Sequence, residues 1–366
     1  MTESRVRPGD VAGAITLQEI LQQPIVWPTT IERIRGACVS ASRLSKATIV
    51  TGAGTSAYAA DAIARAWPGA RAVPATDLLL QTRNEVADAN PAFPEEGLLI
   101  SIARSGDSPE SVAVVEKMRR LFPAVRHLVI TCNENGQLAK LDGVEAIVLD
   151  ARTNDRSLVM TSSFTNLVLA GLAVVHIDQL TPVLPAVCRR AEELLPSLHA
   201  FARELARPDV RRVAILASGD LKPLATEVSL KILEMTAGTV VPIAETFLGL
   251  RHGPMSFLRP DSVVLCWFSS DPLRQKYEAD LIEELQSKNL GRTIAIGKSE
   301  QGMDKVDTFL QAVAPNLSDK LRVPFEILFG QLLAYELSLR CGLNPDNPSP
   351  DGVITRVVRG FRVHED

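Results

Sequence analysis

The second half of this sequence repeats the pattern of its first half. Residues 46–66 (KATIVTGAGTSAYAADAIARA) and 210–235 (VRRVAILASGDLKPLATEVSLKILEM) each combine an apolar strand, a glycine-bearing turn and a helix. Residues 97–120 and 261–286 repeat the same order around a serine-bearing turn. Strands and helices that alternate through short turns predict parallel sheets with right-handed crossovers. The sequence therefore predicts an α/β protein with two tandem domains, each a parallel-sheet three-layer α/β/α sandwich.

The length of 366 residues suits two domains of common size. A charged segment with several prolines separates the two repeats, and we interpret it as a connecting helical segment. The expected division is a helical arm at 1–35, a first domain at 36–180, a helical linker at 181–208, a second domain at 209–343 and a tail at 344–366.

The composition indicates a soluble globular protein, with 46% hydrophobic residues, 22% charged residues and a net charge of -4. This charge gives no reason to expect nucleic acid or a membrane surface as a partner. The scattered cysteines form no C-x-x-C pair, which favours a reducing compartment over a disulfide or zinc framework. The N-terminus MTESRVRPGD has no apolar core of a signal peptide, so we expect a cytoplasmic protein. The five cysteines are Cys38, Cys132, Cys188, Cys266 and Cys341.

One uncharged segment, Leu158 to Ile177, is long enough to span a bilayer. Its first half carries Thr161, Ser162 and other polar residues, which are costly in hydrocarbon. We therefore interpret the segment as a buried helix with a polar end.

The turn after the apolar run at residues 98–100 is rich in hydroxyl groups. Ser108 is predicted as the N-cap and Pro109 as the first residue of the following helix. Unpaired N–H groups at a helix N-terminus favour an anion, and serine hydroxyls add donors. The nucleotide P-loop pattern is absent. From the spacing alone, a phosphate site and an ordinary capped turn both remain open.

A second glycine-bearing turn, residues 52–56 (GAGTS), follows the first strand. With Ala57 in the third glycine's position, a dinucleotide-binding fingerprint is a competing interpretation. Asp77 lies at a suitable distance for the acidic residue of that fingerprint, but it follows Pro74 in a stretch that reads as a helix. A glycine turn without any ligand is the third interpretation.

Two stretches of the second half carry candidate catalytic groups. Glu227, Lys231 and Glu234 share one face of a helix, because they are spaced by four and three residues. Arg251 and His252 lie in the loop sequence RHGP. Taken singly, the first stretch reads as a surface ion pair and the second as a structural loop.

Together, these motifs resemble one family. The sequence ARSGDSPES, from Ala103 to Ser111, resembles the phosphate loop of sugar isomerase (SIS) domains. It is most similar to the tagatose-6-phosphate ketose/aldose isomerase family, also described as galactosamine-6-phosphate deaminase/isomerase. The G-x-G-T-S turn, the E-x-x-L-K-x-x-E helix and the R-H-G-P loop also resemble that family. The resemblance extends from Glu19 to His364 and includes the tail motifs N-P-S-P-x-G, which begins at Asn347, and R-V-V-x-G.

The resemblance implies that the phosphate of a phosphosugar binds in the first domain. It implies that phosphate binds Arg104, Ser105, Gly106, Ser108, Thr55 and Ser56. It implies that the sugar contacts Gly54, Thr161, Ser162, Glu227, Lys231 and Arg251. The second-half turn at residues 269–272 lacks a glycine and carries an acid, so we expect it to bind phosphate poorly.

The isomerase half of glucosamine-6-phosphate synthase carries similar motifs, and these imply the catalytic roles. Glu234 would move the proton between C1 and C2, and His252 would open the sugar ring. In that synthase the histidine comes from the neighbouring subunit, so a homodimer with shared active sites is implied. The tail would close the site; no lysine follows Lys320, which leaves Arg356 or His364 for a tail role.

The implied reaction converts galactosamine 6-phosphate, or a similar hexosamine 6-phosphate, to tagatose 6-phosphate and ammonia. It requires no metal and no organic cofactor. The alternatives are an isomerase of tagatose or galactose 6-phosphate without deamination, a glucosamine-6-phosphate deaminase, and a non-catalytic phosphosugar sensor. No helix-turn-helix or basic segment supports a DNA-binding sensor.

Overall fold

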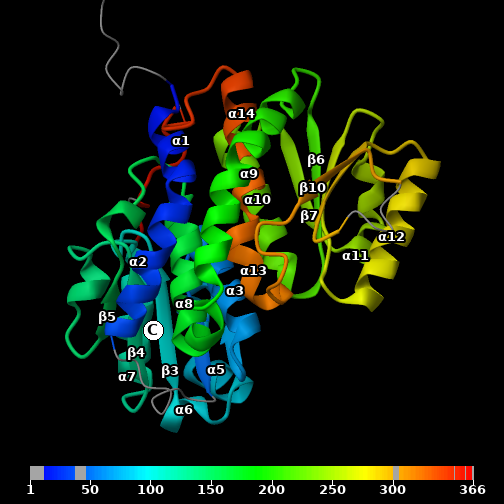
Figure 1. The fold of residues 1–366 in the computed structure, drawn as a ribbon. Coiled ribbons are helices and arrows are strands. Elements are labelled where there is room, and N and C mark those ends of the chain that lie inside the picture. Colours follow the sequence, from blue (N-terminus) through cyan, green and yellow to red (C-terminus); the bar gives the residue numbers. More distant parts are fainter. Residues whose placement is uncertain (1–11, 38–46, 300–304, 350, 359, 365–366) are drawn as a thin grey trace, which may run out of the picture. The chain divides into compact units, whose positions relative to one another are not determined.

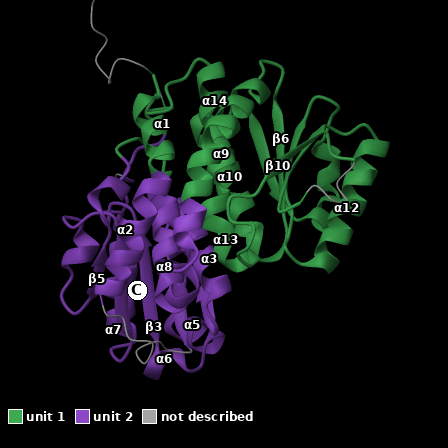
Figure 2. Ribbon diagram, in the orientation of Figure 1, with its two compact units in different colours: residues 1–22, 156–161, 189–353 green, residues 23–155, 162–188, 354–366 purple. Residues whose placement is uncertain are grey.

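A computed structural model describes residues 12–37, 47–299, 305–349, 351–358 and 360–364. It divides into two compact units, shown in Figure 2. Unit 1 comprises residues 1–22, 156–161 and 189–353, and unit 2 comprises residues 23–155, 162–188 and 354–366. Cys38 and the N-terminal MTESRVRPGD lie outside the described residues.

Unit 2 is built on a five-stranded parallel sheet in the order β2-β1-β3-β4-β5. Its central strands are β1 (Thr48–Thr51), β3 (Leu98–Ala103) and β4 (Arg126–Thr131), and its edges are β2 (Ala70–Ala72) and β5 (Glu145–Val148). The helices are α2 (Gln23–Gly36), α3 (Thr55–Ala66), α4 (Ala75–Leu80), α5 (Arg83–Ala89), α6 (Phe93–Glu96), α7 (Pro109–Leu121), η2 (Gln137–Lys140), η3 (Ala151–Thr153) and α8 (Ser162–Leu180).

The sheet of unit 2 is buried on both faces. Leu99 and Val129 pack on one face, in a cluster that includes Leu78 of α4 and Val114 of α7. Helices α2 and α3 each contact α8, and the three helices form the other layer (Figure 1). A parallel sheet covered on both faces explains why every residue of β3 is buried.

Unit 1 contains a second parallel sheet in the order β10-β9-β8-β6-β7. Its strands are β6 (Arg212–Ala217), β7 (Val241–Glu245), β8 (Val263–Trp267), β9 (Arg292–Gly297) and β10 (Thr308–Gln311). The helices are α1 (Ala14–Leu21), α9 (Leu184–Leu205, in unit 1 from Arg189 onward), η4 (Gly219–Leu221), α10 (Lys222–Met235), α11 (Phe247–Leu250), η5 (Pro254–Phe257), α12 (Pro272–Ser287), α13 (Asp319–Glu326) and α14 (Leu328–Arg340). The strand order is that of unit 2, so the predicted repeat and fold class are confirmed.

The core of unit 1 also lies on both faces of its sheet. On one face, Leu216 and Val264 pack with Phe247 of α11 and Leu281 of α12. Helix α10 contacts β6, β7, α13 and α14 on the other face. This packing fixes α10, the helix that carries Glu227, Lys231 and Glu234.

The structure differs from the sequence predictions in local detail. The apolar sequence of residues 321–342 favours one long helix, but in the structure this stretch is divided between α13 and α14, which meet at Ile327. The sequence of residues 16–35 favours a helical pattern that is broken at Gln23-Pro24, whereas in the structure the break between α1 and α2 falls at Gln22. Pro24 is tolerated there because a proline near a helix start removes no intrahelical hydrogen bond.

The uncharged segment forms helix α8, as predicted, and its residues from Ser162 to Val174 are buried. Within the described residues, α8 alone has the length and apolar composition for a membrane crossing. In this structure 78% of its most apolar window is buried. The helix therefore forms part of the core of unit 2.

Candidate active site

The serine-rich loop after β3, residues 104–108, lies at the carboxyl edge of the unit 2 sheet. The carbonyl of Arg104 accepts a hydrogen bond from Thr131 Oγ1, at 3.3 Å. The Ser105 carbonyl accepts from Asn133 Nδ2 at 2.9 Å, and the Gly106 carbonyl accepts from the Leu138 amide at 3.0 Å. In a trans peptide the C=O and N–H point in opposite directions. The amide groups of Ser105, Gly106 and Asp107 therefore face away from residues 131–138, as an anion site requires.

Two glycines allow this arrangement. Gly106 has φ +71°, which side chains disfavour. A Cβ on Gly136 would lie 2.2 Å from the Ser105 carbonyl oxygen, so only glycine permits the close approach. The CNENG turn, residues 132–136, therefore packs against the predicted phosphate loop and holds its backbone in place.

Ser105 and Ser108 supply hydroxyl groups to the loop. Ser105 Oγ accepts a hydrogen bond from the Asp107 amide at 3.2 Å, which leaves its proton for another acceptor. Ser108 is the N-cap of α7 and Pro109 is the first helical residue, as predicted. Within the described residues, the Ser108 side chain makes no capping hydrogen bond. Both hydroxyls are placed to donate to an anion at the N-terminus of α7.

The GAGTS turn directly follows β1. This strand neighbours β3 in the sheet, where Val50 pairs with Ile100 and Thr51 with Ser101. Gly54 has φ +56° and precedes α3. Thr55 and Ser56 occupy the first turn of α3 and are each 5% exposed. A parallel sheet places the ends of β1 and β3 at one edge, where ligands of open α/β sheets bind. Their contact with phosphate stays a prediction.

The tail of unit 2 is anchored beside this loop. The Arg356 guanidinium donates to the Asp155 carbonyl oxygen, at 3.1 Å from Nε, and to Asn154 Oδ1, at 2.7 Å from Nη2. The Arg104 guanidinium, which is 6% exposed, donates from Nη2 to the Arg356 carbonyl at 3.1 Å. Two arginines therefore lie together at the sheet edge. His364 is exposed.

Thr161 and Ser162 are fully buried, in units 1 and 2 respectively. The Thr161 carbonyl accepts from Gln331 Nε2 at 3.1 Å, and the Ser162 carbonyl accepts from Asn166 Nδ2 at 2.8 Å. The N-terminus of α8 is capped by the Asp155 carboxylate, which accepts from the Ser163 amide and hydroxyl. The contacts of Thr161 and Ser162 with the sugar remain predictions.

Helix α10 of unit 1 carries a buried row of charges. Lys231 is wholly buried, and its Nζ lies 3.4 Å from Glu227 Oε1 and 2.5 Å from Glu234 Oε2. Glu227 is also wholly buried, whereas the Glu234 side chain is 24% exposed. The interpretation of this stretch as a surface ion pair, which the sequence left open, is therefore wrong. Buried ion pairs stabilise a fold weakly, so this row favours a functional role.

The loop that carries His252 follows α11. Arg251 Nε donates to Glu284 Oε2 of α12 at 2.7 Å, which anchors the loop. His252 is exposed, and its backbone amide donates to the Gly249 carbonyl at 3.0 Å. In the described part of the chain no hydrogen bond or ion pair joins His252 to Glu234. The sugar-binding role of Arg251 remains a prediction.

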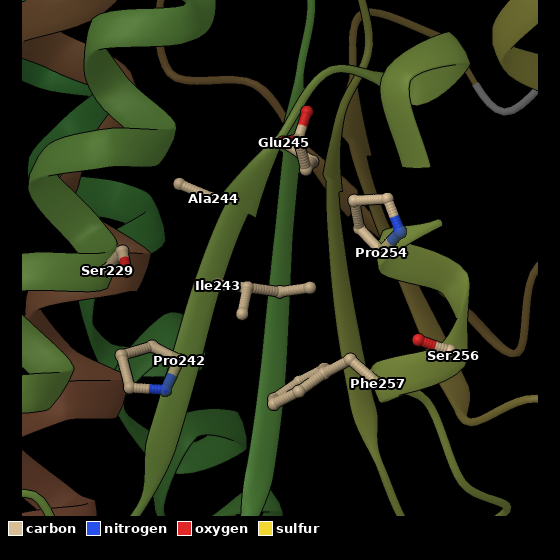
Figure 3. Close-up of a pocket in the computed structure, with 8 residues that line it drawn as sticks. All are labelled: Ser229, Pro242, Ile243, Ala244, Glu245, Pro254, Ser256 and Phe257. Carbon is tan, nitrogen blue, oxygen red and sulfur yellow. The ribbon is translucent and has the colours of Figure 1, made fainter. Parts of the chain in front are cut away.

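A pocket of about 620 Å³ lies along edge strand β7 of unit 1 (Figure 3). Ser229 of α10 borders it on one side and Phe257 of η5 on the other, with Ile243 between them. Glu245 lines the pocket, and its Oε2 accepts from the Thr246 amide at 3.1 Å. Three large apolar side chains near β7 are also exposed: Leu233 (46%), Val241 (49%) and Leu248 (42%).

The second-half loop after β8, residues 268–271, is satisfied by carboxylates of unit 1 itself. Asp319 accepts from the Ser270 amide at 2.8 Å and from Ser269 Oγ at 2.5 Å. Glu278 Oε2 accepts from the Ser269 amide at 2.9 Å. These acceptors agree with the expectation that this loop binds phosphate poorly.

Glu278 makes the stability of unit 1 depend on pH. Burial raises the pKa of its carboxyl from 4.5 to about 7. The folded state thus favours the protonated form: this contribution is fully present below pH 4.5 and is lost as pH rises through about 7. Glu278→Gln should therefore be more stable than the unchanged chain at pH 8, by up to about 3 kcal/mol, and equally stable near pH 4.5. Urea unfolding at both values measures this difference; the exposed Glu283→Gln is the control, and equal stability of Glu278→Gln and the unchanged chain at pH 8 would contradict it.

Two roles were not predicted from the sequence. Asn133 and Gly136 hold the phosphate loop, and Arg356 anchors the tail. The CNENG motif was a usable signal, but its contact with Ser105 joins residues 28 positions apart. Among the described residues, no group of three or more His, Cys, Asp or Glu side chains is arranged to hold a metal ion.

The chain is similar to curated proteins along its whole length. It is 34% identical over 388 residues to the D-galactosamine-6-phosphate deaminase AgaS of Escherichia coli, covering 100% of this chain and 99% of that protein. It is 35% identical over 369 residues to the protein of that name from Shewanella sp. (strain ANA-3), covering 95% and 91%. This chain belongs to the D-galactosamine-6-phosphate deaminase AgaS family. No family model matches it.

A solved member of related name shares the fold. The crystal structure of tagatose-6-phosphate ketose/aldose isomerase from Escherichia coli matches with a TM-score of 0.84 and 33% identity, covering 97% of this chain and 98% of that one. The SIS fold predicted for the chain is therefore confirmed, with two tandem domains.

The role of Gly136 in positioning the phosphate loop of this AgaS-family chain can be tested by substitution. Gly136→Ala should displace the Ser105 carbonyl and weaken phosphosugar binding about tenfold or more, because the overpacked loop must move. Gly36→Ala, where a Cβ meets nothing within 4 Å, is the matched control. Calorimetric titration measures both. Unchanged affinity in a folded Gly136→Ala protein would show that the turn does not position the loop.

Proposed function

We propose that this chain deaminates and isomerises galactosamine 6-phosphate, or a similar hexosamine 6-phosphate, to tagatose 6-phosphate and ammonia. The names of its relatives support this proposal. The observation that carries it is the buried row on α10, in which Lys231 holds Glu234 at a partly exposed position. A single well-held carboxylate is what a proton transfer between adjacent carbons requires.

The phosphate of the substrate would bind the loop of unit 2. Ser105, Ser108 and the loop amides are its donors, with Thr55, Ser56 and the Arg104 guanidinium as further contacts. Charge-assisted hydrogen bonds of this kind are short and strong, and a helix N-terminus adds favourable potential. Binding energy at the phosphate would thereby orient the reacting end of the sugar.

The reaction would begin with ring opening assisted by His252. Glu234 then removes the proton from C2 and returns it to C1, so that the open-chain aldose becomes a ketimine. Water adds to C2 of the ketimine, ammonia leaves, and the ketone of the product remains. The chemistry needs no external oxidant or reductant, because one carbon is oxidised as its neighbour is reduced.

The active protein is proposed to be a homodimer in which His252 serves the neighbouring copy. The exposure of His252 and the apolar side chains beside β7 support this proposal. Mixing Glu234→Gln with His252→Asn subunits should restore activity through heterodimers with one intact site. Ammonia release after subunit exchange measures it. Exchange without recovered activity would mean that His252 acts within its own chain or not at all.

The tail, predicted at residues 344–366, is proposed to close the phosphate site of unit 2. Its anchor by Arg356 at Asp155 and Asn154 supports this role. The proposed location is the cytoplasm, in agreement with four described cysteines that form no disulfide.

A second candidate function is isomerisation without loss of ammonia. The name of the solved Escherichia coli structure favours it. The experiment that separates the two candidates measures ammonia release from a panel of hexosamine 6-phosphates, and interconversion of tagatose 6-phosphate and galactose 6-phosphate. The proposed function predicts ammonia from a hexosamine 6-phosphate. Interconversion of tagatose 6-phosphate and galactose 6-phosphate, with no ammonia released from any hexosamine 6-phosphate, would support the second candidate.

A further inference from the structure

The loop after β8 in unit 1 is the internal counterpart of the phosphate loop after β3 in unit 2. Both follow the central strand of the same five-strand order, and both lead into a helix with proline at its first residue. The unit 2 loop has five residues, 104–108, and turns at Gly106. The unit 1 loop has four residues, 268–271, and no glycine.

The Asp319 carboxylate accepts hydrogen bonds from the unit 1 loop, as a bound anion would. Its carboxylate accepts from Ser269 Oγ and the Ser270 amide, at 2.5 and 2.8 Å. Nε and Nη2 of Arg322 both lie 3.1 Å from Asp319 Oδ1, and Arg274 Nη1 lies 3.7 Å from Oδ2. Asp319 and Arg322 are 5% and 2% exposed, so this is an interior arrangement.

The groups that surround the Asp319 carboxylate are of the kinds found in phosphate sites. A loop hydroxyl, a loop amide and two guanidinium groups surround one carboxylate, the donor set that phosphate oxygens also select. The remaining donors are taken as well. Glu278 accepts from the Ser269 amide, and Asp271 Oδ1 accepts from the amides of Leu273 and Arg274 at 2.9 Å.

We infer that unit 1 contains a second phosphate cradle which the Asp319 carboxylate occupies permanently in place of a phosphate or sulfate. The side chain comes from α13, 49 residues beyond Ser270, so it is tethered and needs no binding step. The loop is thereby held in its anion-bound form without a ligand. Substrate phosphate is accordingly left to the cradle of unit 2.

The inference predicts that removing the carboxylate opens the cradle. In Asp319→Ala the donors of Ser269 and Ser270 lose this acceptor, and the Arg322 guanidinium, which still donates to the Phe268 carbonyl, loses its carboxylate partner. The variant should therefore have a lower Tm in chloride than the unchanged chain. Inorganic phosphate should then stabilise Asp319→Ala by mass action. We expect its Tm to rise by at least about 3 °C more than that of the unchanged chain on replacing chloride with phosphate at equal ionic strength.

Three further variants make the experiment decisive. Asp319→Ser also vacates the cradle and serves if the alanine variant folds poorly. Asp319→Asn fills the same space and is the matched control, expected to gain no more from phosphate than the unchanged chain. Adding Arg322→Gln to Asp319→Ala should abolish the extra gain.

The outcomes also separate this inference from the proposed function. Phosphate binding by unit 2 affects every variant equally, so only the difference between variants reports on unit 1. If neither Asp319→Ala nor Asp319→Ser gains more from phosphate than Asp319→Asn, the cradle does not exist and the inference is overturned.

Discussion

Glu234→Gln is expected to lower turnover of galactosamine 6-phosphate by about 10²–10⁴-fold, the usual contribution of a general base. The glutamine keeps the shape of the side chain and still accepts a hydrogen bond from Lys231, so phosphosugar affinity should remain close to that of the unchanged chain. Steady-state ammonia release gives the first quantity and calorimetric titration the second.

The matched control for this substitution is Glu283→Gln, because Glu283 lies on the exposed side of α12 and pairs with Lys305. It should alter neither turnover nor affinity. Turnover of Glu234→Gln near that of the unchanged chain would mean that another carboxylate is the base. The candidates are Glu227, wholly buried on the same helix, and Glu245, which lines the β7 pocket.

Replacing both Ser105 and Ser108 by alanine should weaken phosphosugar binding by about 2–5 kcal/mol, taking about 1.5–3 kcal/mol for each charged hydrogen bond with partial replacement by water. The hydroxyl of Ser105 also accepts from the Asp107 amide, so its loss loosens the loop as well. Isothermal titration with a hexosamine 6-phosphate measures the change.

The control pair is Ser197→Ala with Ser287→Ala, since both hydroxyls are exposed and bond only carbonyls of their own helices in the described structure. These two changes should leave the dissociation constant alone. An unchanged dissociation constant in the Ser105 and Ser108 double variant would mean that the substrate phosphate does not bind this loop.

Local sequence signals predicted the elements that hold the site. The Ser108 cap and the Pro109 helix start followed from residues adjacent in the chain, and the repeated strand–turn–helix pattern gave the two parallel sheets. These features depend on neighbours within a few residues, where propensity and capping rules apply.

Contacts between distant residues were not predicted. The Asn133 amide reaches the carbonyl of Ser105, and Asp319 reaches Ser270 across 49 residues. The burial of Glu227 and Lys231 was also missed, because a Glu–Lys spacing of four normally indicates a solvent-facing helix. Only the packing of α10 against α14 and the sheet shows that this face is interior.

The most direct test of the account follows hydrogen and nitrogen together. Galactosamine 6-phosphate is incubated with the protein in deuterated water, and the product is examined by NMR while ammonia is measured. We expect tagatose 6-phosphate with one equivalent of ammonia and solvent deuterium at C1, and we expect Glu234→Gln to lose both the ammonia release and the deuterium incorporation. Release of ammonia at an undiminished rate from Glu234→Gln, or no ammonia from the unchanged protein with any hexosamine 6-phosphate, would contradict it.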